Sequence, residues 1–202
     1  MRTLALLVAF QVAGLLLPCA HAQVPDSLPA GWERRGPILV GASFSMQLDR
    51  EVRHGGLSSA RIHSDDAGGS AYTSLRQGIL ADDYRGRRVR LTGYTRVADV
   101  RTASVWMFVE TATAVDMDNM ADRMLTGTED WRRCEIVLDV PADAVQIFFG
   151  GWIRGPGTLW LDDFAFEVVD RTVPTTSLGK GTRSSPTEPD LPRSPQNLGF
   201  EP

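Results

Sequence analysis

Short runs of alternating apolar and polar residues recur along most of the chain, and turn-forming residues separate them. A period of two is typical of strands that bury one face, while the breaks hold Gly, Pro and Asp, as in "RHGGLS" and "VPADA". No apolar pattern of helical period is sustained beyond the N-terminal segment. The predicted strands cover residues 43–52, 59–64, 71–79, 87–97, 103–113, 130–140, 144–153 and 157–169.

This succession of strands predicts an all-β fold, with two antiparallel sheets packed as a jelly-roll sandwich. Residues 23–170 hold every run and are the expected domain. Residues 171–195 are rich in Pro, Ser and Thr and carry little apolar bulk, which predicts a flexible linker. Apolar alternation returns at the very end of the chain, so we expect a short final strand over 196–202.

The N-terminal segment has the pattern of a secretory signal peptide. Arg2 precedes an apolar run over 4–17, and Ala20-His21-Ala22 is a small-x-small cleavage site. We therefore expect residues 1–22 to be removed and the protein to be exported, to the periplasm or the medium. A lipid on Cys19 is the weaker alternative, because Pro18 precedes it. The apolar run is too short to span a bilayer comfortably, and we expect no transmembrane segment.

Charge and cysteine content narrow the function further. The chain has 21 Lys and Arg against 25 Asp and Glu, a formal net charge of −4, and no basic cluster, so we expect no nucleic-acid partner. Cys134 is alone once the signal peptide is removed, so no internal disulfide can form and the core must hold the fold.

Motifs for catalysis are missing from the sequence. It contains no G-x-S-x-G, H-E-x-x-H or P-loop, and the mature chain has only His54 and His63 as histidines. A glycosidase built on a pair of carboxylates is the remaining enzymatic alternative. We expect a protein that is not an enzyme.

Two strands carry candidates for a binding face. In 103–113, Val105, Met107 and Val109 share the face expected in the core, and Trp106 and Glu110 share the other. An aromatic ring beside a hydrogen-bonding group is how proteins hold sugars, because the ring stacks and the polar group binds hydroxyls. A core role for Trp106 is an equal alternative. Strand 144–153 repeats the pattern near its end. The predicted ligand contacts are Trp106, Glu110, Asp118, Asn119, Trp152 and Arg154.

Three polar features need a second explanation. The loop 116–123, which supplies Asp118 and Asn119, resembles part of a calcium loop but lacks the glycine and distal glutamate of an EF-hand. Gln77 falls in an apolar phase, so it must be hydrogen-bonded, and we expect a structural role. Asp162 shares its face with three aromatic residues, and a buried carboxylate needs a cation, an arginine or several N–H donors.

Several stretches together resemble a known superfamily. They are "GW" at 31–32, "LDREVRHGGLSSARI" at 48–62, "YRGRRVRLTGY" at 84–94, "GTEDWRRCEIVLDVPADA" at 127–144 and "GTLWLDDFAFEVV" at 157–169. The chain resembles the galactose-binding-like β-jelly-roll superfamily over residues 31–170. More narrowly, it is similar to small secreted bacterial proteins of unknown role, some labelled transcriptional regulators, through Asp118-Asn119-Met120, Arg123, Gly127-Thr128 and Asp130-Trp131.

The resemblance gives the chain's end a meaning. Related carbohydrate-binding modules begin with a strand N-x-x-F-E before the "GW", and here that motif stands at Asn197 to Glu201 instead. This implies a circular permutation in which the final strand returns to a sheet edge; a disordered tail or the remnant of a lost module is the alternative. In such modules the glutamate helps to hold structural Ca²⁺, which implies a site at Asp49, Glu51, Asp162 and Glu201.

These inferences predict a secreted, non-catalytic binding module whose partner is a glycan or another envelope component. The alternative is an envelope protein that binds proteins or has a structural role. An exposed apolar patch would favour that alternative, and a polar groove with a tryptophan floor would favour the sugar.

Overall fold

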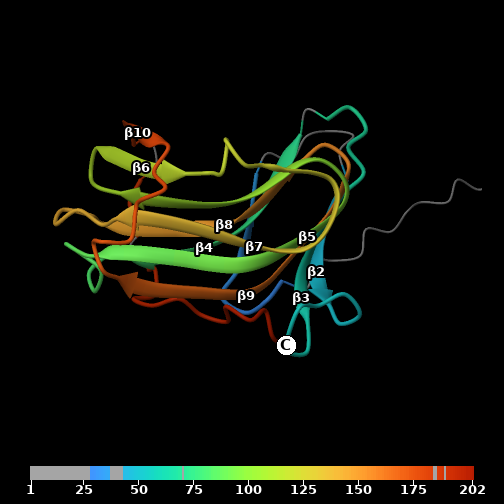
Figure 1. The fold of residues 1–202 in the computed structure, drawn as a ribbon, viewed down its shortest axis with the longest axis horizontal. Coiled ribbons are helices and arrows are strands. Elements are labelled where there is room, and N and C mark those ends of the chain that lie inside the picture. The colour runs from blue at the N-terminus through green and yellow to red at the C-terminus, as the bar shows by residue number, and fades with distance from the viewer. Residues whose placement is uncertain (1–27, 37–42, 70, 184–185, 189) are drawn as a thin grey trace, which may run out of the picture.

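The protein is described by a computed structural model, which covers residues 28–36, 43–69, 71–183, 186–188 and 190–202. The predicted signal peptide lies outside these residues. The described chain is all-β, without a helix, and every strand pairing is antiparallel (Figure 1). The strands are β1 (Glu33–Arg35), β2 (Phe44–Asp49), β3 (Ser59–Ser64), β4 (Tyr72–Leu80), β5 (Arg88–Glu110), β6 (Ala114–Asp118), β7 (Leu125–Asp139), β8 (Gln146–Arg154), β9 (Gly157–Val169) and β10 (Gly179–Thr182).

One long strand, β5, connects the two layers of the fold. Its first half pairs with β7 and β9, and its second half pairs with β8 and β6. Bulges between Thr95 and Ala103, with Asp99 at a φ of 53°, mark the bend. The sequence predicts two separate strands here. They are one strand because pairing continues through the bend, at Val97 and Val100 with β7 and at Val97 and Ala98 with β9.

Each layer has its own strand order around that bend. One layer runs β1-β4-β8-β5-β6-β10, and the other runs β7-β5-β9-β3-β2. The predicted two-sheet sandwich is confirmed, formed by a single continuous sheet that folds over on itself. The core fills the space between the layers, and the predicted inward phase of β5 is confirmed, since Val105, Met107 and Val109 are buried.

The segment after β9 follows the domain instead of leaving it. Residues 179–182 form β10 against β6, Thr176 exchanges hydrogen bonds with Val137, and Leu80 donates its N–H to the Pro192 carbonyl. The stretch predicted as a flexible linker thus makes defined contacts. Figure 1 shows this C-terminal segment passing below β9 to end near β2 and β3.

The last residues dock, but as a turn and not as a strand. Asn197 and Glu201 exchange hydrogen bonds at 2.8 Å, and this turn inserts Phe200, which is fully buried, into the core. The backbone of this turn contacts β9 through the Phe164 N–H, which donates to the Leu198 carbonyl at 2.9 Å, without the regular pairing of a strand. The predicted strand over 196–202 is therefore corrected: one aromatic anchor and a closed turn replace it.

Gln77 has the structural role that its position predicts. It is buried, it donates to the carbonyls of Gly31 and Gln196, and it accepts the Gln196 N–H at 2.7 Å. It therefore joins β4 to the returning tail. None of the described residues forms a helix long and apolar enough to cross a membrane.

Candidate functional site

A cavity of about 540 Å³ lies on the outer face of the β4-β8-β5 layer, and we call it the cleft. Residues of the three strands pair in register across this face. Trp152 lies between Ser74 and Ser104, and Gly150 lies between Arg76 and Trp106. Paired residues on neighbouring strands direct their side chains to the same face of a sheet. The lining residues are Arg35, Gly36, Tyr72, Ser74, Arg76, Trp106, Phe108, Glu110, Asn119, Phe148, Trp152, Arg154 and Glu188.

Glycine shapes one end of this surface. Gly78 pairs with Phe148, and a Cβ at Gly78 would lie 2.4 Å from the Phe148 ring. The absent side chain leaves room for the ring to lie flat. The guanidinium of Arg76 in turn sits 4.3 Å from the centroid of that ring.

The aromatic residues of the cleft differ in exposure. Trp106 is 8% exposed, packs against Phe108, and donates its indole N–H to the Ser74 hydroxyl at 3.1 Å, so it forms part of the floor. Trp152 and Phe108 are half-buried, and Tyr72 is 40% exposed. These three rings are the ones that a ligand could cover.

Most charges at the cleft are paired within the protein. Arg76 donates to Glu33 at 2.6 Å and to Glu188 at 2.7 Å, and Arg35 lies 3.1 Å from Glu33. Glu188 belongs to the C-terminal segment, so that segment supplies one wall. The result is a fixed polar rim next to the aromatic floor.

Glu110 occupies the far end and is also engaged. Its side chain is buried, accepts from Gln146 at 2.6 Å and pairs with Arg183 at 2.8 Å. The Arg183 side chain is itself 3% exposed. This buried pair ties the C-terminal segment to the end of β5.

Five of the six residues predicted to contact a ligand lie around this one cleft; the exception is Asp118. Asp118 is fully buried, accepts the Met120 N–H at 2.7 Å, and pairs with Arg123 at 2.5 Å. It does not line the cleft, because it ends strand β6, which occupies the first part of the predicted loop 116–123. Ligand binding by the other five stays a prediction.

The cleft also has members that the sequence analysis did not select. Tyr72, Ser74 and Arg76 come from β4, whose place beside β8 is a long-range property of the sheet. Glu188 comes from the segment predicted as linker. The sequence did indicate Phe148, because it falls on the same face of the predicted strand 144–153 as Trp152.

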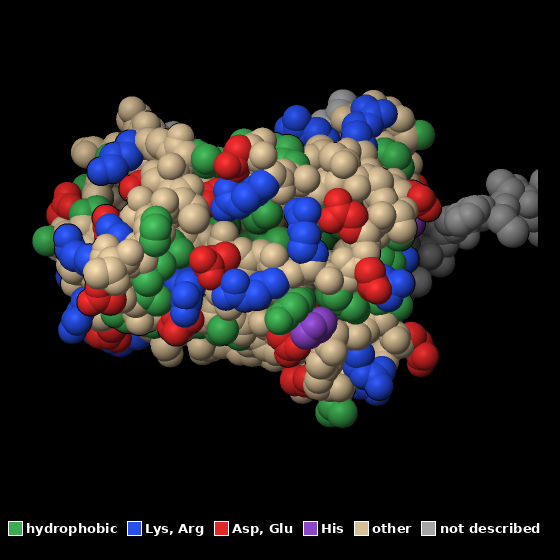
Figure 2. Space-filling view, viewed as in Figure 1, with side chains coloured by type: hydrophobic (Ala, Val, Ile, Leu, Met, Phe, Trp, Pro, Cys, Tyr) green, Lys and Arg blue, Asp and Glu red, His purple; other side chains and the backbone are tan. Residues whose placement is uncertain are grey.

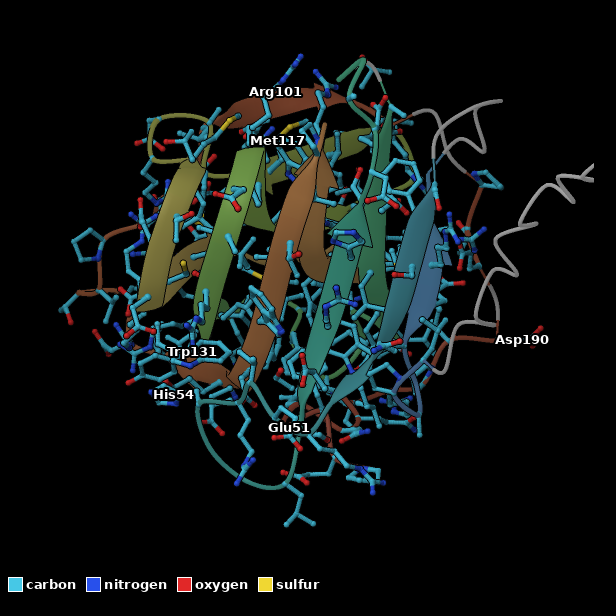
Figure 3. The ribbon with its side chains drawn as sticks, turned by 90° about the vertical axis from the view of Figure 1, so that its right-hand side faces the viewer. Glu51, His54, Arg101, Met117, Trp131 and Asp190 are labelled. Atoms are coloured by element: carbon cyan, nitrogen blue, oxygen red, sulfur yellow. The ribbon has the colours of Figure 1, made fainter. Side chains whose placement is uncertain are left out.

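None of the carboxylates predicted for calcium lines the cleft. Figure 3 shows Glu51, one of them, with His54 at one end of the molecule and Arg101 at the other. Asp162 accepts backbone N–H groups of His54, Gly55 and Asp163 at 2.7, 3.1 and 2.7 Å. Burial raises the pKa of Asp162 despite these donors. The sequence alternative of several N–H partners is the one observed.

The other predicted calcium ligands also take protein donors. Asp49 accepts from Trp160 at 2.8 Å and from the Glu51 N–H at 2.9 Å, and Glu201 accepts the Leu57 N–H at 3.0 Å. Within the described ranges, no group of three or more His, Cys, Asp or Glu residues is placed to hold a metal ion. Calcium binding by these four residues stays a prediction from the resemblance.

The surface outside the cleft carries mixed charge. Figure 2 shows Lys and Arg side chains interspersed with Asp and Glu over β5, β7 and β9. Arg90 with Glu167 at 2.7 Å is one such pair. Positive and negative side chains therefore alternate on this face.

Comparison with known proteins agrees with the architecture. No family model matches the chain. It is 38% identical over 176 residues to an "Uncharacterized HTH-type transcriptional regulator YbfP" of Bacillus subtilis (strain 168), covering 83% of this chain and 57% of that protein. The chain thus spans little more than half the length of this relative.

Solved structures give the fold. The C-terminal family 22 carbohydrate-binding module of Clostridium thermocellum Xyn10B matches with a TM-score of 0.51 at 12% identity, over 71% of this chain and 89% of that one. The fold is the β-sandwich of carbohydrate-binding modules. The enzymatically active domain of tailspike protein 4 from bacteriophage CBA120 matches with a TM-score of 0.52 at 12% identity, over 69% of this chain but 20% of that one.

Proposed function

We propose that the protein is an exported, non-catalytic binding protein that holds a carbohydrate in the cleft. The observation that carries this proposal is the pairing of accessible rings, Trp152 and Tyr72, with fixed polar groups around a cavity of about 540 Å³. Sugar rings stack their C–H faces on aromatic side chains and hydrogen-bond their hydroxyls to polar neighbours. The β-sandwich shared with carbohydrate-binding modules supports the proposal at the level of the fold.

The carboxylates of the cleft support a role without catalysis. Glycoside hydrolysis uses two carboxyl groups that act directly on the sugar. Glu188 lies between Arg76 and Arg35, and Glu110 is covered by Arg183. Both carboxylates are therefore committed to arginines of the protein, which fits a rigid binding surface.

The polar rim also favours a glycan over a protein partner. A docking surface for a protein would present a continuous apolar patch. Here the apolar residues of the cleft are aromatic and lie among arginine and glutamate side chains. Export is proposed from the signal-peptide pattern alone and is tested by cell fractionation.

The experiment is a binding screen of residues 23–202 against a broad panel of polysaccharides, with Trp152→Ala and Trp131→Ala as matched variants. Both tryptophans are half-buried, but Trp131 lies beside His54, away from the cleft. We expect binding by the wild type and by Trp131→Ala, and loss in Trp152→Ala. Folded protein that binds no glycan would overturn the proposal.

A further inference from the structure

The charges around the cleft are unevenly compensated. Arg35 and Arg76 share Glu33 and Glu188, and Glu110 is matched by Arg183. The guanidinium of Arg154 has no carboxylate of a described residue within 4 Å. It is exposed, and it lines the cavity. Among the described residues, the cleft thus offers one cation that the protein itself does not neutralise.

This cation sits against two of the accessible rings, Tyr72 and Trp152. Arg154 ends β8, pairs in register with Tyr72 on β4, and lies two residues from Trp152. Its guanidinium carbon is 5.8 Å from the Tyr72 ring centroid and 5.9 Å from that of Trp152. A substituent at the edge of a sugar stacked on Trp152 would meet this guanidinium.

A second arginine, Arg101, lies near this end but outside the cleft lining, with its guanidinium against Gly69. Arg101 lies directly against Gly155, the residue that follows Arg154, and its N–H is bonded to the Pro156 carbonyl. Like Arg154, it has no carboxylate of a described residue within 4 Å. The opposite end of the cleft, where Glu110 is paired with Arg183, lacks such an excess.

We propose that the cleft selects acidic glycans, with the carboxylate of a uronic acid bound to Arg154 while its ring stacks on Trp152. A guanidinium binds a carboxylate through two parallel hydrogen bonds, and such charge-assisted bonds are about twice as strong as neutral ones. A neutral sugar can stack on the same rings but leaves Arg154 to water. This inference rests on the proposed function and names its substrate class.

The test compares each acidic ligand with its own neutral form. Oligosaccharides of galacturonate, glucuronate and mannuronate are titrated into residues 23–202 by calorimetry beside the same oligosaccharides after carboxyl reduction. We expect at least one acidic member to bind about tenfold more tightly than its reduced form, a difference of about 1.4 kcal/mol, with a preference that weakens as salt is added.

Variants then assign the preference to one side chain. Arg154→Gln should bring the acidic and reduced forms within about twofold, and Arg154→Lys should fall between, because an ammonium cannot form the paired bonds. Arg87→Gln is the matched control, an exposed arginine in the turn before β5, and should keep the wild-type preference. An oligosaccharide that carries sulfate groups but no uronic acid distinguishes carboxylate recognition from general attraction to anions.

The outcomes separate this inference from the function on which it rests. Equal binding of acidic and reduced forms that Trp152→Ala still abolishes would keep the glycan function and overturn the acidic selectivity. A preference that survives Arg154→Gln, or a sulfated ligand that binds as tightly as the uronates, would overturn the assignment to a uronate carboxylate. No binding to any glycan would overturn both proposals.

Discussion

Two aromatic clusters lie on opposite sides of one layer of the sheet, and only one of them is open. On the inner side, the Trp32 ring lies 4.7 Å from that of Phe200 and 5.8 Å from that of Phe149, and Phe164 completes the group. On the outer side, Trp106 packs on Phe108 at 4.7 Å, near Phe148 and Trp152. Both clusters include neighbouring residues of β8, so the same strand builds a core and a surface.

The difference between them is what fills the space. The inner cluster is completed by the chain itself, because the C-terminal turn inserts Phe200 and the Trp32 indole donates to the Asn197 carbonyl at 3.0 Å. Among the described residues, the outer cluster has no such fully buried insert; the C-terminal segment reaches it with Glu188 at the rim and with the half-buried Leu191 beside Gly78 and Phe148. Aromatic content alone therefore does not identify a site. Whether the chain covers the rings decides between core and cleft.

The largest expected effect comes from emptying the closed cluster. Phe200→Ala should lower the free energy of unfolding by about 4 kcal/mol, because it leaves a cavity beside the rings of Trp32 and Phe164. Urea unfolding measures it. Trp152→Ala is the matched control in the open cleft, with an expected loss under about 1 kcal/mol. Equal losses would contradict the distinction, as would an unchanged midpoint for Phe200→Ala.

The next effect tests Asp118, the predicted ligand contact that does not line the cleft. Asp118→Asn should cost about 2 to 3 kcal/mol, because it leaves Arg123 without its buried partner. Asp116→Asn, on the same strand but half-buried and bonded to Ser177, should cost less than about 1 kcal/mol. Glycan binding should persist in both folded variants. Binding lost in Asp118→Asn, with the fold intact, would return Asp118 to the site.

The sequence pattern predicts which face of a strand a residue occupies, but not which residues lie near it in the fold. Alternation alone placed Trp106 and Glu110 on the outer face of β5, and β3 and β9 have the predicted bounds. Alternation cannot say which strands become neighbours, so Tyr72 and Arg76 were not selected. Nor can it say whether an aspartate next to a turn faces solvent or an arginine five residues later, as Asp118 faces Arg123.

The smallest effect concerns the start of the C-terminal segment. Arg88 donates two hydrogen bonds of 2.9 Å to Asp139 and also reaches the carbonyls of Arg171 and Val173. These bonds hold the pKa of Asp139 below its usual value. A lowered pKa stabilises the fold above the unfolded pKa of about 3.9, and that stability is lost as the pH falls through the lowered value.

Asp139→Asn should therefore cost about 0.5 kcal/mol at pH 7, since the pair is partly exposed. Its stability should converge with that of the wild type as the pH falls below about 4. Urea midpoints of both proteins over a pH series measure this. A difference that grows toward acid pH would show that Arg88 does not stabilise the ionised form.

The most direct test of the central claim observes the tryptophans themselves. The chain has five, at positions 32, 106, 131, 152 and 160, and each indole N–H gives one signal in a ¹H–¹⁵N spectrum, assigned by single variants. On titration with a glycan that binds in the screen, we expect the Trp152 and Trp106 signals to shift while that of Trp32, bonded to Asn197 inside the closed cluster, stays in place. Shifts confined to Trp131 or Trp160, with the cleft signals unmoved, would contradict the account.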